Sequence, residues 1–124
     1  MKNSRAQIVA TVGPASINKD VLKSMIEHQV DVVRFNFSWA NPGERLPHIN
    51  LVKELSKEID KRIPIILDLP GPRVQNENGH TYDSNLSGLT EHDKELVKFG
   101  IEHGVDYIAL SFVSGKKEIE MCRE

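Results

Sequence analysis

Polar residues that could bind an ion or a charged ligand interrupt several apolar runs of this chain. The stretch VVRFNFS, residues 32–38, sets Arg34 and Asn36 between hydrophobic neighbours. An arginine buried in mid-strand needs an anion, which is either Asp68 on a neighbouring strand or a phosphate or carboxylate ligand. Asn36, Ser38 and Asp68 offer hard oxygens, which suit a cation or, in the simpler reading, a hydrogen-bond network joining two strands.

The elements that must position these residues alternate between short apolar runs and longer amphipathic ones. Asn18 predicts one helix N-cap, and Asn41 followed by Pro42 predicts a second. Thr90 with Asp93 three residues later resembles a capping box. Strands are predicted over residues 7–12, 31–37, 63–69 and 105–112, and helices over residues 18–29, 42–62, 90–104 and 115–124.

This alternation predicts an α/β fold with right-handed βαβ crossovers and a parallel sheet covered on both faces. A closed (β/α)₈ barrel needs about 250 residues, or roughly 31 per unit. The 124 residues therefore hold about four units, half of a barrel. A small open doubly wound sheet of flavodoxin type could also be built from four parallel strands, and spacing alone leaves both open.

Side chains alternate between the two faces of a strand, so Arg34, Asn36 and Ser38 share one side while Phe35 and Phe37 take the other. In parallel α/β folds the carboxyl ends of the strands line the ligand crevice. Each predicted strand ends in polar residues. Those expected to converge at this edge are Thr11, Arg34, Asn36, Ser38, Asp68 and Ser111.

Composition excludes several classes of function. The formal net charge is −2 and the positive residues are scattered, which argues against a nucleic-acid or membrane-surface partner. The lone Cys122 has no activating neighbour in sequence, and the five histidines show no metal-ligand spacing. The N-terminal stretch lacks the apolar region of a signal peptide, so a cytoplasmic location is expected.

Four ordered motifs resemble the N-terminal barrel motifs of pyruvate kinase: QIVATVGPAS, VVRFNFS, ILDLPGP and LTEHDKELVKFGIEHGVDYIALSFV. The resemblance covers nearly the whole chain. It implies a (β/α)₈ TIM barrel that transfers a phosphoryl group from phosphoenolpyruvate to ADP in glycolysis, giving pyruvate and ATP. It also implies a divalent ion, usually Mg²⁺, and commonly K⁺.

The resemblance also implies roles for individual residues. Arg34 would contact the transferring phosphoryl group, with Ser111 beside the substrate. Thr11 and Pro14 would lie near the nucleotide or the site without performing chemistry. The monovalent cation would be held by Asn36, Ser38, Asp68 and the main-chain carbonyl of Leu69.

The chain departs from the family pattern at several positions. The family's Thr-Lys-Gly-Pro-Glu-Ile-Arg run reads LPGPRVQ here, so this chain differs from the family at the nucleotide-side contacts. The large lid domain is reduced to a short polar segment, residues 74–88, expected to be a loop. The substituted positions are Trp39 and Ala40 for a His-Gly pair, Leu69, Pro70 and Gln75 for Thr, Lys and Arg, and Ser114 for an arginine.

The leading hypothesis is that residues 1–124 form the N-terminal half of a pyruvate kinase-type barrel domain, inactive alone because the divalent-metal ligands of the family lie on later strands. Such a half is expected to self-associate or to bind a complementing half-barrel. Two alternatives stay open. One is a non-catalytic relative that binds a phosphorylated small acid or serves as an assembly partner, and the other is a lyase or aldolase on a similar barrel.

Overall fold

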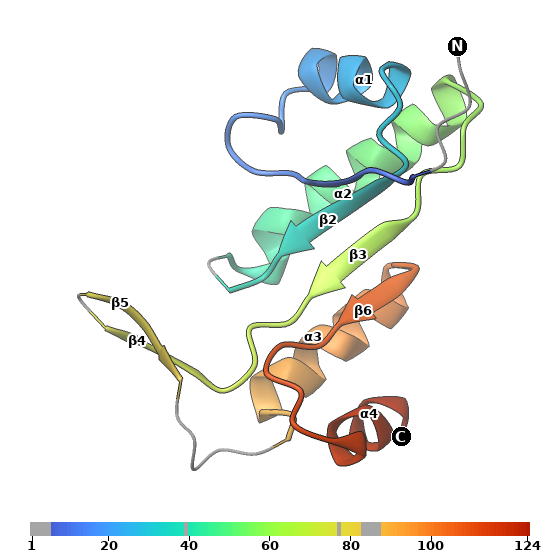
Figure 1. Cartoon of the computed structure of the whole chain (residues 1–124). Helices are drawn as coiled ribbons and strands as arrows, with labels where there is room; N and C mark the ends of the chain where they lie inside the picture. The colour runs from blue at the N-terminus through green and yellow to red at the C-terminus, as the bar shows by residue number, and fades with distance from the viewer. Residues whose placement is uncertain (1–5, 39, 77, 83–87) are drawn as a thin grey trace.

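The computed structural model describes residues 6–38, 40–76, 78–82 and 88–124. Four parallel strands form the central sheet in the consecutive order β1-β2-β3-β6, and helices connect them (Figure 1). Within the described ranges every helix is too short or too polar to span a bilayer. The bounds are β1 Val9–Thr11, α1 Lys19–Glu27, β2 Val32–Asn36, α2 Pro42–Glu58, β3 Ile65–Asp68, β4 Arg73–Asn76, β5 Gly79–Tyr82, α3 Glu91–Glu102, β6 Tyr107–Ala109 and α4 Lys116–Arg123.

The helix starts are those predicted from the capping residues. The side chain of Asn18 accepts a hydrogen bond from Asp20 N at 2.9 Å, and that of Asn41 accepts one from Gly43 N at 2.9 Å. Thr90 and Asp93 form the predicted capping box at the start of α3. These bonds satisfy backbone N–H groups that have no partner inside the helix, so the signal is local and readable from sequence.

Three helices end earlier than predicted. Helix α1 ends at Glu27 and not Gln29, α2 ends at Glu58 and not Arg62, and α3 ends at Glu102 and not Gly104. Gln29 and Asp60 adopt left-handed backbone angles, with φ of 73° and 54°. A residue in that region cannot continue a right-handed helix, so the chain turns toward the next strand at these points.

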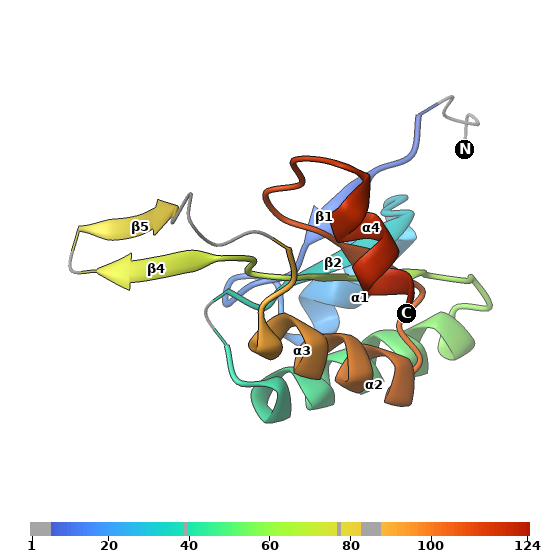
Figure 2. The same ribbon diagram turned by 90° about the horizontal axis from the view of Figure 1, so that it is seen from below.

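Helices α1, α2 and α3 all pack on the same face of the sheet, as the view in Figure 2 shows. This corrects the prediction of a sheet covered on both faces. Each crossover advances by one strand in the same direction, and right-handed crossovers that advance in one direction place their helices on one side. The core therefore lies between that face and the three helices, and includes Phe35, Leu67, Leu22, Ile49, Leu55 and Leu96.

The segment predicted as a polar loop contains a β-hairpin. Strands β4 and β5 pair antiparallel, with Arg73 opposite Tyr82 and Asn76 opposite Gly79. Gly79 has φ of 116°, a conformation that residues with a Cβ rarely adopt. The hairpin projects away from the sheet in both views (Figures 1 and 2). Positions 77 and 83–87 of this segment lie outside the described residues, as does Trp39.

Candidate functional site

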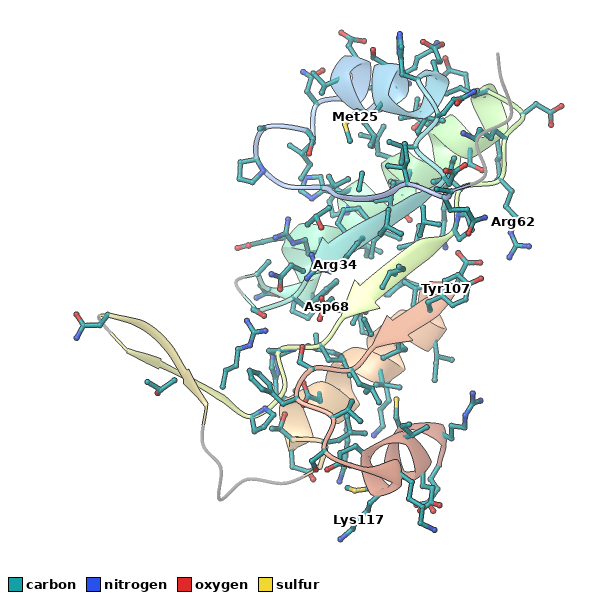
Figure 3. The ribbon with its side chains drawn as sticks, viewed as in Figure 1. Met25, Arg34, Arg62, Asp68, Tyr107 and Lys117 are labelled. Atoms are coloured by element: carbon teal, nitrogen blue, oxygen red, sulfur yellow. The ribbon has the colours of Figure 1, made fainter. Side chains whose placement is uncertain are left out.

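An arginine–aspartate ion pair lies at the carboxyl edge of the sheet, where β2 and β3 run side by side. Arg34 Nε donates to Asp68 Oδ2 at 2.7 Å, and Arg34 Nη2 contacts the same oxygen. Figure 3 shows the two side chains on the open face of the sheet. The side chains are 32% and 14% exposed, so the pair is accessible from this face. Asp68 is thus the anion that Arg34 required, one of the two alternatives that the sequence left open.

Two hydroxyl groups from the outer strands extend this network across the sheet. Arg34 Nη1 donates to Thr11 Oγ1 at 2.7 Å, and Ser111 Oγ donates to Asp68 Oδ1 at 3.3 Å. The structure therefore brings Thr11, Arg34, Asp68 and Ser111 together, as the convergence of strand ends predicts. A guanidinium has five N–H donors, and three are used here. The other two donors of Arg34 have no hydrogen-bond partner among the described residues.

Asn36 and Ser38 lie at the same edge but are bonded differently. Asn36 Oδ1 accepts from the backbone N–H of Ser38 at 2.9 Å, which ties the turn after β2. Ser38 Oγ is buried and has no hydrogen-bond partner among the described residues. Buried hydroxyl groups are nearly always satisfied, so this oxygen is suited to a cation or another ligand that no described residue supplies.

Two further residues were predicted at the site, Leu69 and Pro14. Leu69 directly follows Asp68 in the chain, whereas Pro14 lies in the turn after β1. The backbone N–H of Leu69 donates to the Ala109 carbonyl at 3.0 Å, and the Leu69 side chain is 1% exposed in the core. Pro14 is exposed in a turn closed by Gly13 and Ser16, whose side chain accepts from Gly13 N at 3.1 Å. No described hydrogen bond joins Pro14 to the Arg34 network.

Ser114, which stands where an arginine is usual in the family, has a local bonding role. Its hydroxyl donates to Glu118 Oε1 at 2.6 Å, and Gly115 N donates to Glu118 Oε2 at 3.1 Å. The Ser114 hydrogen bond, helped by backbone N–H groups, holds the pKa of Glu118 below its usual range. Ser114 therefore supports the start of α4.

Two further arginines lie near the edge and were not singled out from sequence. Arg45 Nη2 donates to the backbone carbonyl of Asn36 at 3.4 Å, from the first turns of α2. Arg73, at the start of β4, places Cζ 5.2 Å from the ring centroid of Phe112. In the sequence, each of these residues is only an arginine that follows a predicted strand. Ordinary surface arginines occur in the same position.

Asp93 anchors the turn that carries Arg73. It is 1% exposed, and its Oδ1 accepts from Gly71 N at 3.1 Å while its Oδ2 accepts from Thr90 N at 3.1 Å. One carboxylate therefore caps α3 and also holds the loop that follows β3. Gly71 has φ of +67°, and a Cβ there would lie 3.1 Å from Phe112 and from the Ser111 carbonyl, so this close approach favours glycine.

Neither the histidines nor the cysteine forms a recognisable centre within the described ranges. No group of three or more His, Cys, Asp or Glu side chains is arranged there to hold a metal ion. Burial raises the pKa of the Cys122 thiol, which disfavours the nucleophilic thiolate. Burial, together with the charge of Arg45, lowers the pKa of His48.

Comparison with known proteins identifies the sequence family of this chain. A family model described as the barrel domain of pyruvate kinase matches residues 3–84. The pyruvate kinase of Staphylococcus saprophyticus subsp. saprophyticus is 34% identical over 74 residues, which are 60% of this chain and 13% of that protein. The pyruvate kinase of Staphylococcus aureus strain USA300 is 32% identical over 74 residues, which again are 60% of this chain and 13% of that protein. The chain thus matches only a small part of the length of these relatives.

Proposed function

Since this chain belongs to the pyruvate kinase family, we propose that its polar sheet edge is the phosphoenolpyruvate-binding edge of a (β/α)₈ barrel. Two features of the fold support the barrel over a doubly wound sheet. The strand order is consecutive, and the three connecting helices share one face (Figure 2). A doubly wound sheet would reverse its strand order and carry helices on both faces.

In this proposal Arg34 binds the phosphoryl group of phosphoenolpyruvate with its two remaining N–H donors. Asp68 and Thr11 hold the guanidinium in place, so it enters the reaction already oriented. Phosphoryl transfer depends mainly on positioning and on neutralising the charge of the transferred group, which an oriented arginine provides. Ser111 is a positioning residue that fixes the other oxygen of Asp68.

The donor set at this edge fits a monovalent cation. Asn36, Ser38, Asp68 and the Leu69 carbonyl are all oxygen donors, and the buried unpartnered Ser38 hydroxyl is the observation in favour. A K⁺ ion bound there would offset the negative charge of the substrate beside Asp68. The described residues do not show a comparable set of carboxylates for Mg²⁺. In this proposal the Mg²⁺ and ADP of the family reaction are bound by other parts of the whole enzyme. We propose a cytoplasmic location for that enzyme.

The observation that carries the proposal is the oriented, accessible Arg34 in a chain matched by the barrel-domain model. Its test is calorimetric titration of phosphoenolpyruvate into the protein and into Arg34→Met. We expect binding to weaken about tenfold or more, because a charge-assisted hydrogen bond is lost. Arg62→Met is the matched control, since Arg62 is 81% exposed and pairs with Asp106 at the opposite end of the sheet. Equal affinity in Arg34→Met and the parent protein would refute the assignment.

We also propose that the 124-residue chain does not by itself turn over phosphoenolpyruvate. Arg34 addresses only part of the charge to be neutralised, and a narrow hairpin stands where a lid would exclude water. Pyruvate formation is measured with Mg²⁺, K⁺ and ADP present, beside the Arg34→Met control. Turnover that disappears in the control would contradict this statement. Ligand binding without turnover supports it. A non-catalytic relative that binds a phosphorylated small acid would give the same result.

The open face supports a further proposal about assembly, with a second copy or a complementing half-barrel as the partner. In the four-stranded sheet, β1 and β6 each have a neighbour on one side only. Val9 on β1 is 51% exposed and Tyr107 on β6 is 56% exposed. Unpaired edges beside apolar side chains favour association. Light scattering at micromolar concentration should show a dimer or larger species, whereas a monodisperse monomer would contradict the proposal.

A further inference from the structure

Asp93 is a buried carboxylate that joins two segments far apart in the sequence. It is 1% exposed, and its Oδ2 accepts from the backbone N–H of Thr90 at 3.1 Å, the usual capping bond of a helix such as α3. Its Oδ1 accepts from the backbone N–H of Gly71 at 3.1 Å, in the chain that leaves β3 and passes the start of α3 (Figure 1). The cap uses only one of the two oxygens, so the second oxygen has a role outside α3.

Glu118 shows what a buried capping carboxylate does without such a link. It is 8% exposed and occupies in α4 the position that Asp93 occupies in α3. Its two oxygens accept from Ser114 Oγ and from Gly115 N, both within four residues of it. The bond from Gly71, 22 residues away in the chain, therefore distinguishes Asp93 from a carboxylate that only caps a helix.

Gly71 carries this link from α3 to the end of β6. Its N–H is held by Asp93, and its carbonyl accepts from Arg73 N at 2.8 Å. A Cβ added to it would lie 3.1 Å from the Ser111 carbonyl oxygen and 3.1 Å from the Phe112 ring. The loop after β3 is therefore fixed between the start of α3 on one side and the chain that follows β6 on the other.

This loop begins at the ion pair of the proposed ligand site. Asp68 is three residues before Gly71 in the chain. It accepts from Ser111 Oγ at 3.3 Å and from Arg34 Nε at 2.7 Å. Movement of Gly71 away from Ser111 would shift Asp68 against both of its partners. Ligand geometry is sensitive to displacements of about 1 Å, so the loop position matters for Arg34.

We propose that Asp93 is a positioning residue for this site. Buried behind the loop, it touches no ligand itself. Its bond to Gly71 holds Asp68 and, through Asp68, the Arg34 guanidinium in the arrangement that binds the ligand. A hydrogen bond to a charged acceptor is stronger than one between neutral groups, which suits a carboxylate to this role. The inference rests on the function proposed above for Arg34.

The test compares Asp93→Ala with two variants that weaken a helix cap and leave Gly71 bonded to Asp93. Phosphoenolpyruvate is titrated by calorimetry well below every melting transition. Asp93→Ala should weaken its binding about threefold to tenfold, because the loop loses its acceptor. Thr90→Ala at the cap of α3 and Glu118→Ala at the cap of α4 should lower the melting temperature by about 3–8 °C and keep the parent affinity. An equal loss of affinity in the two cap variants would assign Asp93 to folding and overturn the proposal.

A second variant acts on the loop without changing Asp93. Gly71→Ala should push the loop away from Ser111, since the added Cβ meets the Ser111 carbonyl and the positive φ of Gly71, +67°, disfavours alanine. It should weaken phosphoenolpyruvate binding to a similar extent as Asp93→Ala. This variant decides the case if Asp93→Ala does not fold. Parent affinity in Gly71→Ala would then overturn the proposal.

Amide hydrogen exchange of the free protein gives a measurement that needs no ligand. Asp93→Ala should speed exchange of the Gly71 N–H about tenfold or more, because its acceptor is removed. Glu118→Ala should leave it within about twofold of the parent rate. An unchanged rate at Gly71 in Asp93→Ala would show that the carboxylate does not hold the loop, which would overturn the proposal.

The positioning role and the proposed function can fail separately. Weaker phosphoenolpyruvate binding in Arg34→Met, with parent affinity in Asp93→Ala and Gly71→Ala, would keep the proposed function and overturn the role of Asp93. The reverse pattern would support a loop held by Asp93 and remove Arg34 from the proposed function. Parent affinity in all three variants would refute both.

Discussion

The two faces of the central sheet are built from the same strands and have opposite properties. On the helix-covered face, Val33, Phe35 and Leu67 are 0% exposed. On the other face, Val9 and Tyr107 are more than half exposed, and Arg34 stands between two buried neighbours in sequence. The covered face holds the fold together through packing. The open face carries the polar network and the unpaired edges. The alternation of side chains along a strand thus puts the stabilising core and the proposed ligand site on opposite faces.

The largest expected effect tests the packing side of this comparison. Phe35→Ala on the covered face should lower the free energy of unfolding by about 3–5 kcal/mol, since it removes a fully buried ring and leaves a cavity. Tyr107→Ser on the open face should change it by less than about 1 kcal/mol. Urea denaturation followed by circular dichroism measures both. Similar losses at the two positions would mean that the open face is also a packed surface.

Substitution of two glycines by alanine tests the packing of the covered face in a second way. A Cβ on Gly100 would lie 2.9 Å from Val105 Cγ2 and 3.2 Å from Leu67 Cδ1, under the covered face. Gly100→Ala should therefore cost about 1–3 kcal/mol through overpacking. A Cβ added to Gly13, after β1, would have no neighbouring atom within 4 Å, so Gly13→Ala is the matched neutral control. A neutral result at Gly100 would show that the interface between α3 and the sheet is loose.

The ion pair on the open face should matter less for stability than the core. Arg34→Met and Asp68→Asn each leave one charged partner behind, yet the site is partly exposed, so each should cost about 1–2 kcal/mol. The double variant should cost less than the sum of the two by about 1 kcal/mol. Strict additivity in denaturant unfolding would show that the pair contributes no coupling, which leaves Arg34 more available to a ligand.

The smallest expected effect is a pH dependence located at the start of α2. Burial and the charge of Arg45 lower the pKa of His48 below its ordinary value of 6.5. The unfolded chain therefore takes up the proton more readily, so stability is highest above about pH 6.5 and falls as the pH drops through that value toward the folded pKa. His48→Gln should flatten this part of the profile. An identical pH profile in the variant would assign the dependence to other groups.

Sequence by itself determined the local features of this protein. The N-caps at Asn18, Asn41 and Thr90 were predicted and are confirmed, because capping hydrogen bonds join residues only two or three positions apart. The placement of Arg34 and Asp68 on one face was also predicted, because side chains alternate strictly along a strand. Four short motifs sufficed to indicate the family, and the match to residues 3–84 confirms it.

Tertiary structure alone decided which face the helices cover and what gathers at the open edge. The side taken by a helix depends on the direction in which each crossover advances, and that direction is set by strand pairing between distant segments rather than by any local pattern. The same holds for the partner of Arg34 and for the approach of Arg45 and Arg73 to the strand ends. The sequence around an arginine that follows a strand is the same whether the side chain faces water or a ligand. Its neighbours in space come from distant segments, which only the folded chain brings together.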